Sequence, residues 1–186
     1  MTEAGSLDKT SASRRREGAA LRQVRVGGAS KAELLAQLEA AGVALNEAGK
    51  SLFADERFTT SAVTSLREVV ELAVAELGFA EGATWAQVIE RAMSQGLTPC
   101  PLELGPHLRL QFLDQAEGFL GQPVTQHRAP PGSLTVASLP IAEDDDTPKG
   151  FYLRRIEGVL WLRGYRSGAD HLWSPEDRLV FCRAGD

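Results

Sequence analysis

The chain has 186 residues, 43% of them hydrophobic, so it can bury a core and is expected to form one domain, or one domain with a small N-terminal module. Its formal net charge of −5 argues against a protein that binds DNA over most of its surface. No apolar run approaches the roughly 20 residues that a membrane helix needs, and the first residues lack the apolar region of a secretory signal, so we expect a cytoplasmic protein without a membrane partner.

The N-terminal part predicts a disordered tail and then a strand and a helix. Residues 1–19 are polar and small and show no hydrophobic period, which is typical of disorder. Residues 21–26 alternate as in a strand. Ser30 and Glu33 have the spacing of a capping box and predict a helix that ends near Ala41.

A second short helix completes this part of the chain. Gly42 stands where a left-handed residue would end the first helix. Asn46 is a suitable cap for the second helix, which carries Leu52 and Phe53. We therefore assign residues 20–58 to a small β-α-α module. The stripe of the first helix that is expected to be buried consists of Leu34, Leu35 and Leu38.

Residues 59–186 predict an α+β domain with one main helix and a mainly antiparallel sheet. The segment 67–75 fits a helix as well as a strand, and its alternating apolar residues favour the strand. Three prolines, at 99, 101 and 106, argue against a long helix there. The expected elements are a strand at 67–75, a helix over Trp85–Gln95 with Thr84 and Gln87 as its capping box, strands at 108–113 and 133–138, a hairpin over Lys149–Arg166 and a last strand at Arg178–Cys182.

The hairpin, KGFYLRRIEGVLWLRGYR, carries five basic residues and one acidic residue in a chain that is acidic overall. Glu157 and Gly158 suit a tight turn, which pairs residue 156 with 159, 154 with 161 and 152 with 163. One face of the hairpin is then the core face, with Phe151, Leu153, Arg155, Leu160 and Leu162. The opposite face mixes aromatic rings with guanidinium groups and consists of Tyr152, Arg154, Ile156, Val159, Trp161, Arg163 and Tyr165.

Surfaces that combine rings with guanidinium groups stack bases or sugars and hold phosphates. We therefore predict that an anionic partner binds to Tyr152, Arg154, Trp161, Arg163 and Tyr165. Arg109 and His107 extend this patch if the strand at 108–113 presents them on the same face. The structural alternative is that Arg154 lies over Trp161 in a cation–π contact and that a helix covers the two tyrosines.

The octet Ala44–Ser51, ALNEAGKS, matches a relaxed Walker A pattern. A phosphate loop of that type follows a buried strand, whereas the preceding segment, KAELLAQLEAAG, predicts a helix. We therefore expect Gly49 and Lys50 to lie on a short surface helix.

The remaining residue types predict no cofactor and no metal site. The histidines, His107, His127 and His171, lack metal-ligand spacing, and the acidic run at 143–146 lacks the pattern of a calcium loop. Cys100 and Cys182 lack CxxC spacing and are expected to be buried. No nucleophile motif such as GxSxG occurs.

Three segments, VRVGGASKAELLAQLEAAGVALNEAGKSLF, CPLELGPHLRLQFLDQ and PKGFYLRRIEGVLWLRGYR, resemble a family of bacterial proteins without assigned function, and the likeness spans most of residues 20–183. Some members of that family carry a helicase label, but this chain has no helicase motif set and too few residues for two motor lobes. The resemblance implies no catalytic residue. It supports a single compact bacterial unit.

Three hypotheses about function follow. The first is a non-enzymatic binding protein whose hairpin face takes an anionic partner, which is a nucleic acid, a nucleotide or an acidic protein surface. The second is a small enzyme with a site assembled from loops near His107, Arg109, His127 and Arg128. The third is an interaction module whose aromatic face docks another protein chain.

Overall fold

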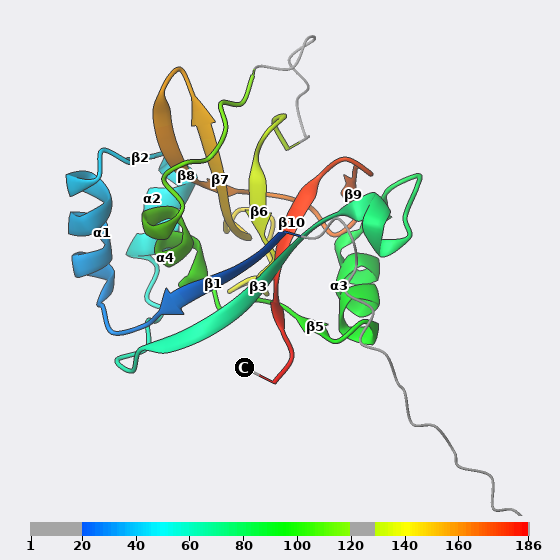
Figure 1. Cartoon of the computed structure of the whole chain (residues 1–186), viewed down its shortest axis with the longest axis horizontal. Coiled ribbons are helices and arrows are strands. Elements are labelled where there is room, and N and C mark those ends of the chain that lie inside the picture. Colours follow the sequence, from blue (N-terminus) through cyan, green and yellow to red (C-terminus); the bar gives the residue numbers. More distant parts are fainter. Residues whose placement is uncertain (1–19, 120–128, 186) are drawn as a thin grey trace, which may run out of the picture.

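The computed structural model describes residues 20–119 and 129–185, and it has the α+β architecture that the sequence predicts (Figure 1). The main sheet has the strand order β1-β3-β10-β6-β7-β8-β2, and β5 pairs with β10 beside this path. Its neighbours are antiparallel except for the pairs β10–β6 and β2–β8. The strands of the main sheet are β1 (Ala20–Val26), β2 (Ala44–Leu45), β3 (Ser65–Ala73), β5 (Leu97–Thr98), β6 (Leu134–Val136), β7 (Gly150–Ile156), β8 (Val159–Tyr165) and β10 (Arg178–Arg183).

Helices lie on both sides of this sheet (Figure 1). They are α1 (Lys31–Ala40), α2 (Glu47–Ala54), α3 (Trp85–Ser94) and α4 (Leu104–Gln111), with a short 3-10 helix, η1 (Val74–Leu77). A two-stranded sheet of β4 (Ala83–Thr84) and β9 (Leu172–Trp173) stands next to α3. Within the described residues, none of the helices has the length and apolar character that a membrane crossing requires.

The helix starts and stops in residues 20–58 are those that the sequence predicts. Ser30 and Glu33 form a complete capping box at α1, and Gly42 has the expected positive φ of 68°. The prediction that Leu35 is buried is wrong: its exposed fraction is 37%, because it lies about 100° around the helix from the buried Leu34. The two strands of this segment join the main sheet, β1 beside β3 and β2 beside β8, so residues 20–58 share a sheet and a core with the rest of the chain.

The predicted strand at 108–113 is wrong, because this stretch belongs to helix α4 and the residues after it. Pro106 is the third residue of α4, within the first turn, where a backbone N–H has no partner inside the helix and a proline is tolerated. Leu104 and Leu108 are four residues apart and both are buried, as expected for one helix face. The second part of the chain therefore has α4 in addition to the one main helix that was predicted. The strand β3 and the capping box of α3 at Thr84 and Gln87 are confirmed.

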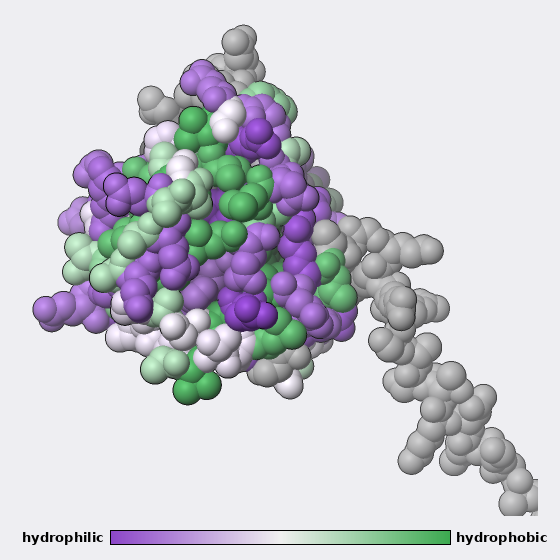
Figure 2. Space-filling model, turned by 60° about the vertical axis from the view of Figure 1, so that its left-hand side comes forward, coloured by the Kyte–Doolittle hydropathy of each residue, from purple (hydrophilic) through white to green (hydrophobic). Residues whose placement is uncertain are grey.

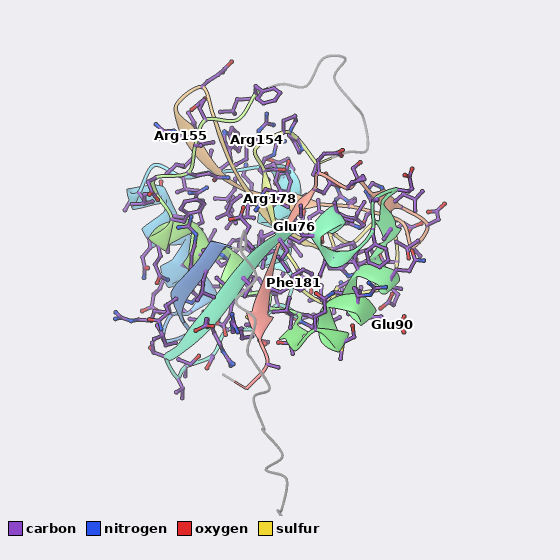
Figure 3. The ribbon with its side chains drawn as sticks, turned by 45° about the vertical axis from the view of Figure 1, so that its right-hand side comes forward. Glu76, Glu90, Arg154, Arg155, Arg178 and Phe181 are labelled. Carbon is purple, nitrogen blue, oxygen red and sulfur yellow. The ribbon has the colours of Figure 1, made fainter. Side chains whose placement is uncertain are left out.

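The two faces of the sheet support two separate cores. Helices α1, α2 and α4 cover the first face, and α3, η1, β4 and β9 cover part of the second. Figure 3 shows Phe181 of β10 near α3 and Arg154 of the hairpin well away from that helix. The second core reaches across β3 and β10 and meets β8 at Tyr165, so the second face of β7 and β8 carries a different set of side chains. The first core includes Val24, Leu34, Leu52, Leu104, Phe151, Leu153, Leu162 and Val180, and the second includes Val70, Leu72, Val88, Trp173, Leu179 and Phe181.

Candidate functional site

The β7–β8 hairpin has the turn and the register that the sequence predicts. Glu157 and Gly158 both have positive φ, 52° and 76°, which is the conformation of a tight two-residue turn. Tyr152 pairs with Arg163 and Arg154 pairs with Trp161. The face opposite the first core therefore brings together five of the predicted site residues, which we call the Arg/aromatic face: Tyr152, Arg154, Trp161, Arg163 and Tyr165.

This face is less open than the sequence predicted. The rings of Tyr152, Trp161 and Tyr165 are half-buried, and Arg154 has an exposed fraction of only 5%. Burial raises the pKa of both tyrosines above the ordinary value, at which the hydroxyl groups are already protonated at neutral pH. The face therefore offers ring edges and N–H and O–H groups rather than freely solvated side chains.

Arg163 is the guanidinium group that lies over the rings. Its Cζ is 5.1 Å from the ring centroid of Trp161 and 5.9 Å from that of Tyr152. The predicted stacking of Arg154 on Trp161 is thus replaced by a contact from the neighbouring arginine. Cation–π contacts of this kind fix the orientation of a guanidinium group and leave its in-plane N–H groups available for an acceptor.

Arg154 is buried without an internal acceptor for two of its nitrogens. Its Nε and Nη2 are buried and make no hydrogen bond to any of the described residues. Burial lowers the pKa of Arg154, the positive charge of Arg163 lowers it further, and Tyr152 opposes the shift. Within residues 20–119 and 129–185, neither Arg154 nor Arg163 forms a salt bridge.

Other arginines of the chain do have carboxylate partners. Arg155 points from the opposite face of β7, and its Nε lies 3.3 Å from Glu117 Oε2. Arg178 Nε lies 2.5 Å from Glu71 Oε1, and Arg57 Nη2 lies 2.6 Å from Asp55 Oδ2. These three arginines each have a carboxylate partner, whereas the salt bridges among the described residues include none at Arg154 or Arg163; Arg109 likewise bonds only uncharged acceptors.

A pocket of about 570 Å³ adjoins the Arg/aromatic face. Tyr152 and Tyr165 form part of its wall, so the pocket is continuous with the hairpin. Trp173 is at the centre of an aromatic group, with ring centroids 5.6 Å from Tyr165, 5.3 Å from His171 and 5.1 Å from Trp85. The polar side chains that line the pocket include Thr135, Asp145, Arg166, Asp170 and His171.

Sequence reasoning missed most of this pocket. The segment from Arg166 to Trp173 lines it from β8 to β9, and Thr135 contributes from β6, which lies next to β7. No motif marks these residues, because only the pairing of β6 with β7 and the return of the chain after β8 bring them together.

Arg109 and His107 do not extend the patch, because they lie on α4, which packs on the opposite face of the sheet. Arg109 has no exposed surface; its Nη1 donates to Gln115 Oε1 at 2.5 Å, and Nη2 donates to the Phe112 carbonyl oxygen. Burial, with a smaller effect of Arg155, lowers the pKa of Arg109 to about 10. These bonds tie the end of α4 to the chain that follows it.

His107 bonds to the backbone directly after β1. Its Nε2 accepts a hydrogen bond from Gly27 N at 3.0 Å, and burial lowers its pKa. The carboxyl group of Glu103, whose pKa is raised by burial, lies 3.9 Å from the same nitrogen. Two residues of the loop-assembled enzyme site, His107 and Arg109, thus have structural partners, and the other two, at 127 and 128, lie outside the described residues.

The Walker-like octet forms no phosphate loop. Asn46 caps α2, whose fourth and fifth residues are Lys50 and Ser51, and Lys50 Nζ lies 2.8 Å from Glu47 Oε1. Gly49 packs closely on β8, where a Cβ would lie 3.2 Å from Gly164 N. The expected short helix is confirmed and Lys50 is on the surface, but the expectation that Gly49 is also on the surface is wrong, because Gly49 is buried against β8.

Both cysteines are buried, as predicted. In the described part of the chain, no group of three or more His, Cys, Asp and Glu side chains is arranged to hold a metal ion. Figure 2 brings the α1 side forward and shows apolar residues interspersed with hydrophilic ones over that view. Since His107, Arg109 and Lys50 have partners within the fold, the Arg/aromatic face and its pocket are the candidate site.

Comparison with family models, with curated proteins and with solved structures gave no match for this chain.

Proposed function

We propose that this chain is a binding protein of the bacterial cytoplasm that holds an anionic partner on the Arg/aromatic face of β7 and β8. The observation that supports this most directly is the pair of neighbouring guanidinium groups, Arg154 and Arg163, without a carboxylate partner among the described residues. A buried charge without a partner destabilises a fold, so its presence calls for a partner that arrives from outside.

The chemistry of the face favours an anion with several acceptor oxygens. Guanidinium groups donate in a planar fork that matches phosphate and carboxylate geometry. The two arginines come from neighbouring strands, with Arg163 facing Tyr152 and Arg154 facing Trp161, so one anion can lie between them. Burial, with a smaller effect of the charge of Arg163, lowers the pKa of Arg154, and an anion bound there would offset both effects.

The surroundings favour a small anion over a long nucleic acid. Asp145 and Asp170 line the adjoining pocket, and the acidic run at 143–146 belongs to the same loop as Asp145. A polyanion that crossed the face would pass these carboxylates, whereas a small ligand can place its charge on the arginines alone. Nucleic acid and an acidic protein surface are the alternative partners, and the experiment below separates nucleic acid from a small anion.

Isothermal titration with pyrophosphate tests the proposal. We expect binding that weakens with added salt, and a loss of at least tenfold in affinity for Arg163→Gln. The matched control is Arg25→Gln, because Arg25 is an exposed arginine on β1 whose backbone bonds to Gln111 do not involve its guanidinium group.

An unchanged affinity in a folded Arg163→Gln protein, or an equal loss in Arg25→Gln, would overturn the proposal. A single-stranded oligonucleotide is titrated in parallel. If it binds through Arg163 with a steep salt dependence while pyrophosphate does not bind, the partner is a nucleic acid and not a small anion.

A further inference from the structure

We propose that the pocket beside Tyr152 takes a planar heterocyclic ring with an amino group, joined to the anionic group that the arginines hold. The ligand class is thus a nucleoside monophosphate with an amino-bearing base. This inference rests on the proposed function, because it names the ligand of the same face.

The pocket and the arginines are placed for the two ends of one molecule. Tyr152 lines the pocket, and its ring centroid is 5.9 Å from Arg163 Cζ. Tyr165, which also lines the pocket, is two residues beyond Arg163 on the same face of β8, a distance of about 7 Å along the strand. A ring in the pocket and a phosphate on Arg163 would therefore be separated by about the length of a pentose.

The aromatic walls of the pocket suit a flat ring. Tyr152, Tyr165 and Trp173 supply aromatic surface, and the ring planes of Tyr165 and Trp173 are nearly perpendicular, at 86°. Rings inserted among aromatic side chains gain stacked and edge-to-face contacts. The volume of about 570 Å³ lies in the range of cavities that bind small molecules.

The charges set the orientation of the ligand. Asp145 and Asp170 supply carboxylate acceptors at the pocket, and Arg166, whose Nε donates to the Asp146 carbonyl oxygen at 2.6 Å, is its cationic group. Two carboxylates beside one guanidinium group disfavour a phosphate in the pocket and favour a group that donates hydrogen bonds, such as an exocyclic amino group. The phosphate end is left to Arg163 and Arg154.

Cytidine and uridine 5′-monophosphate provide a matched test, because they have the same size and charge and differ in the exocyclic group of the base. We expect isothermal titration to show cytidine monophosphate binding about threefold to tenfold more tightly than uridine monophosphate, and ribose 5-phosphate more weakly than either. Asp170→Asn should reduce the preference for cytidine, while Glu176→Gln, an exposed acidic residue outside the pocket lining, should leave it unchanged.

Equal affinity for cytidine monophosphate, uridine monophosphate and ribose 5-phosphate would overturn this inference and leave the anion site intact, provided that pyrophosphate still binds through Arg163. If the unmodified protein binds none of these ligands and no pyrophosphate, the proposed function itself is overturned. An equal reduction of the preference for cytidine by Asp170→Asn and by Glu176→Gln would also count against the pocket, because Asp170 lines it and Glu176 does not.

Discussion

Replacement of Arg154 by methionine should stabilise the free protein and weaken its binding of pyrophosphate. Arg154 is 5% exposed, and its Nε and Nη2 have no acceptor in the part of the chain that the structure describes. Methionine keeps an unbranched apolar stem and removes the charge that Arg163 repels. Since an unsatisfied buried polar group costs about 1–3 kcal/mol, and apolar replacement of buried ions has gained about 1–4 kcal/mol elsewhere, we expect a gain of about 1–3 kcal/mol.

Urea denaturation followed by tryptophan fluorescence measures this change. In a domain of this size, a gain of 1 kcal/mol raises the melting temperature by roughly 2–4 °C, so thermal unfolding supplies a second readout. The matched control is Arg178→Met. Arg178 is also an arginine on a strand of the main sheet, but it forms a salt bridge with Glu71. Loss of that partly exposed pair should cost up to about 1 kcal/mol.

The two variants should therefore move in opposite directions. If Arg154→Met lowers the free energy of unfolding as much as Arg178→Met does, and leaves pyrophosphate affinity unchanged, then Arg154 has a structural role and the reasoning fails. A stabilised variant that still binds pyrophosphate with full affinity would separate the two claims and remove Arg154 from the site.

Three further predictions concern the elements around the site. Asn46→Ala should cost about 1–3 kcal/mol in urea denaturation, because its side chain both caps α2 and bonds the backbone at the end of β8, whereas Asn46→Asp, which keeps the cap, should cost less. Burial lowers the pKa of His107, so the folded protein binds that proton more weakly than the unfolded chain and loses stability as the pH falls below about 6.5. His107→Gln keeps an acceptor for Gly27 N and should flatten this part of the pH dependence of unfolding, while the opposite contribution of Glu103 remains in both proteins; an unchanged slope would contradict it. Lys50→Ala should leave pyrophosphate affinity unchanged in the same titration, because Lys50 pairs with a glutamate on α2, and a large loss would restore the Walker-like segment as a site.

The parts of the fold that could be predicted are those that short-range chemistry decides. The capping boxes at Ser30 and Thr84 fixed the starts of α1 and α3, and the Glu157–Gly158 turn fixed the hairpin register. Helix α4 was missed because Pro106 was taken as incompatible with a helix, although a proline in the first turn removes no internal hydrogen bond. The alternation of Leu108, Leu110 and Phe112 then favoured a strand, as is common for short apolar runs.

The candidate site could be predicted only as far as the hairpin extends. Strict alternation placed Tyr152, Arg154 and Trp161 on one face, and the structure has them there. Which arginine lies over the rings depends on rotamers that local pattern does not set, and the arginine is Arg163. The pocket depends on the pairing of β6 with β7 and on the path of the chain after β8, which are long-range features that local sequence patterns do not specify.

The sheet itself explains why a site can form at this place. Its second face is covered by α3 over β3 and β10, while the β7–β8 part is covered by the stems and rings of its own side chains. Arginine stems can cover apolar surface, so burial alone would be compatible with a purely structural cover. A structural cover, however, needs only the stems, and methionine would supply them without two adjacent like charges that lack carboxylate partners among the described residues. An anionic partner therefore explains the guanidinium groups, which a structural cover does not need.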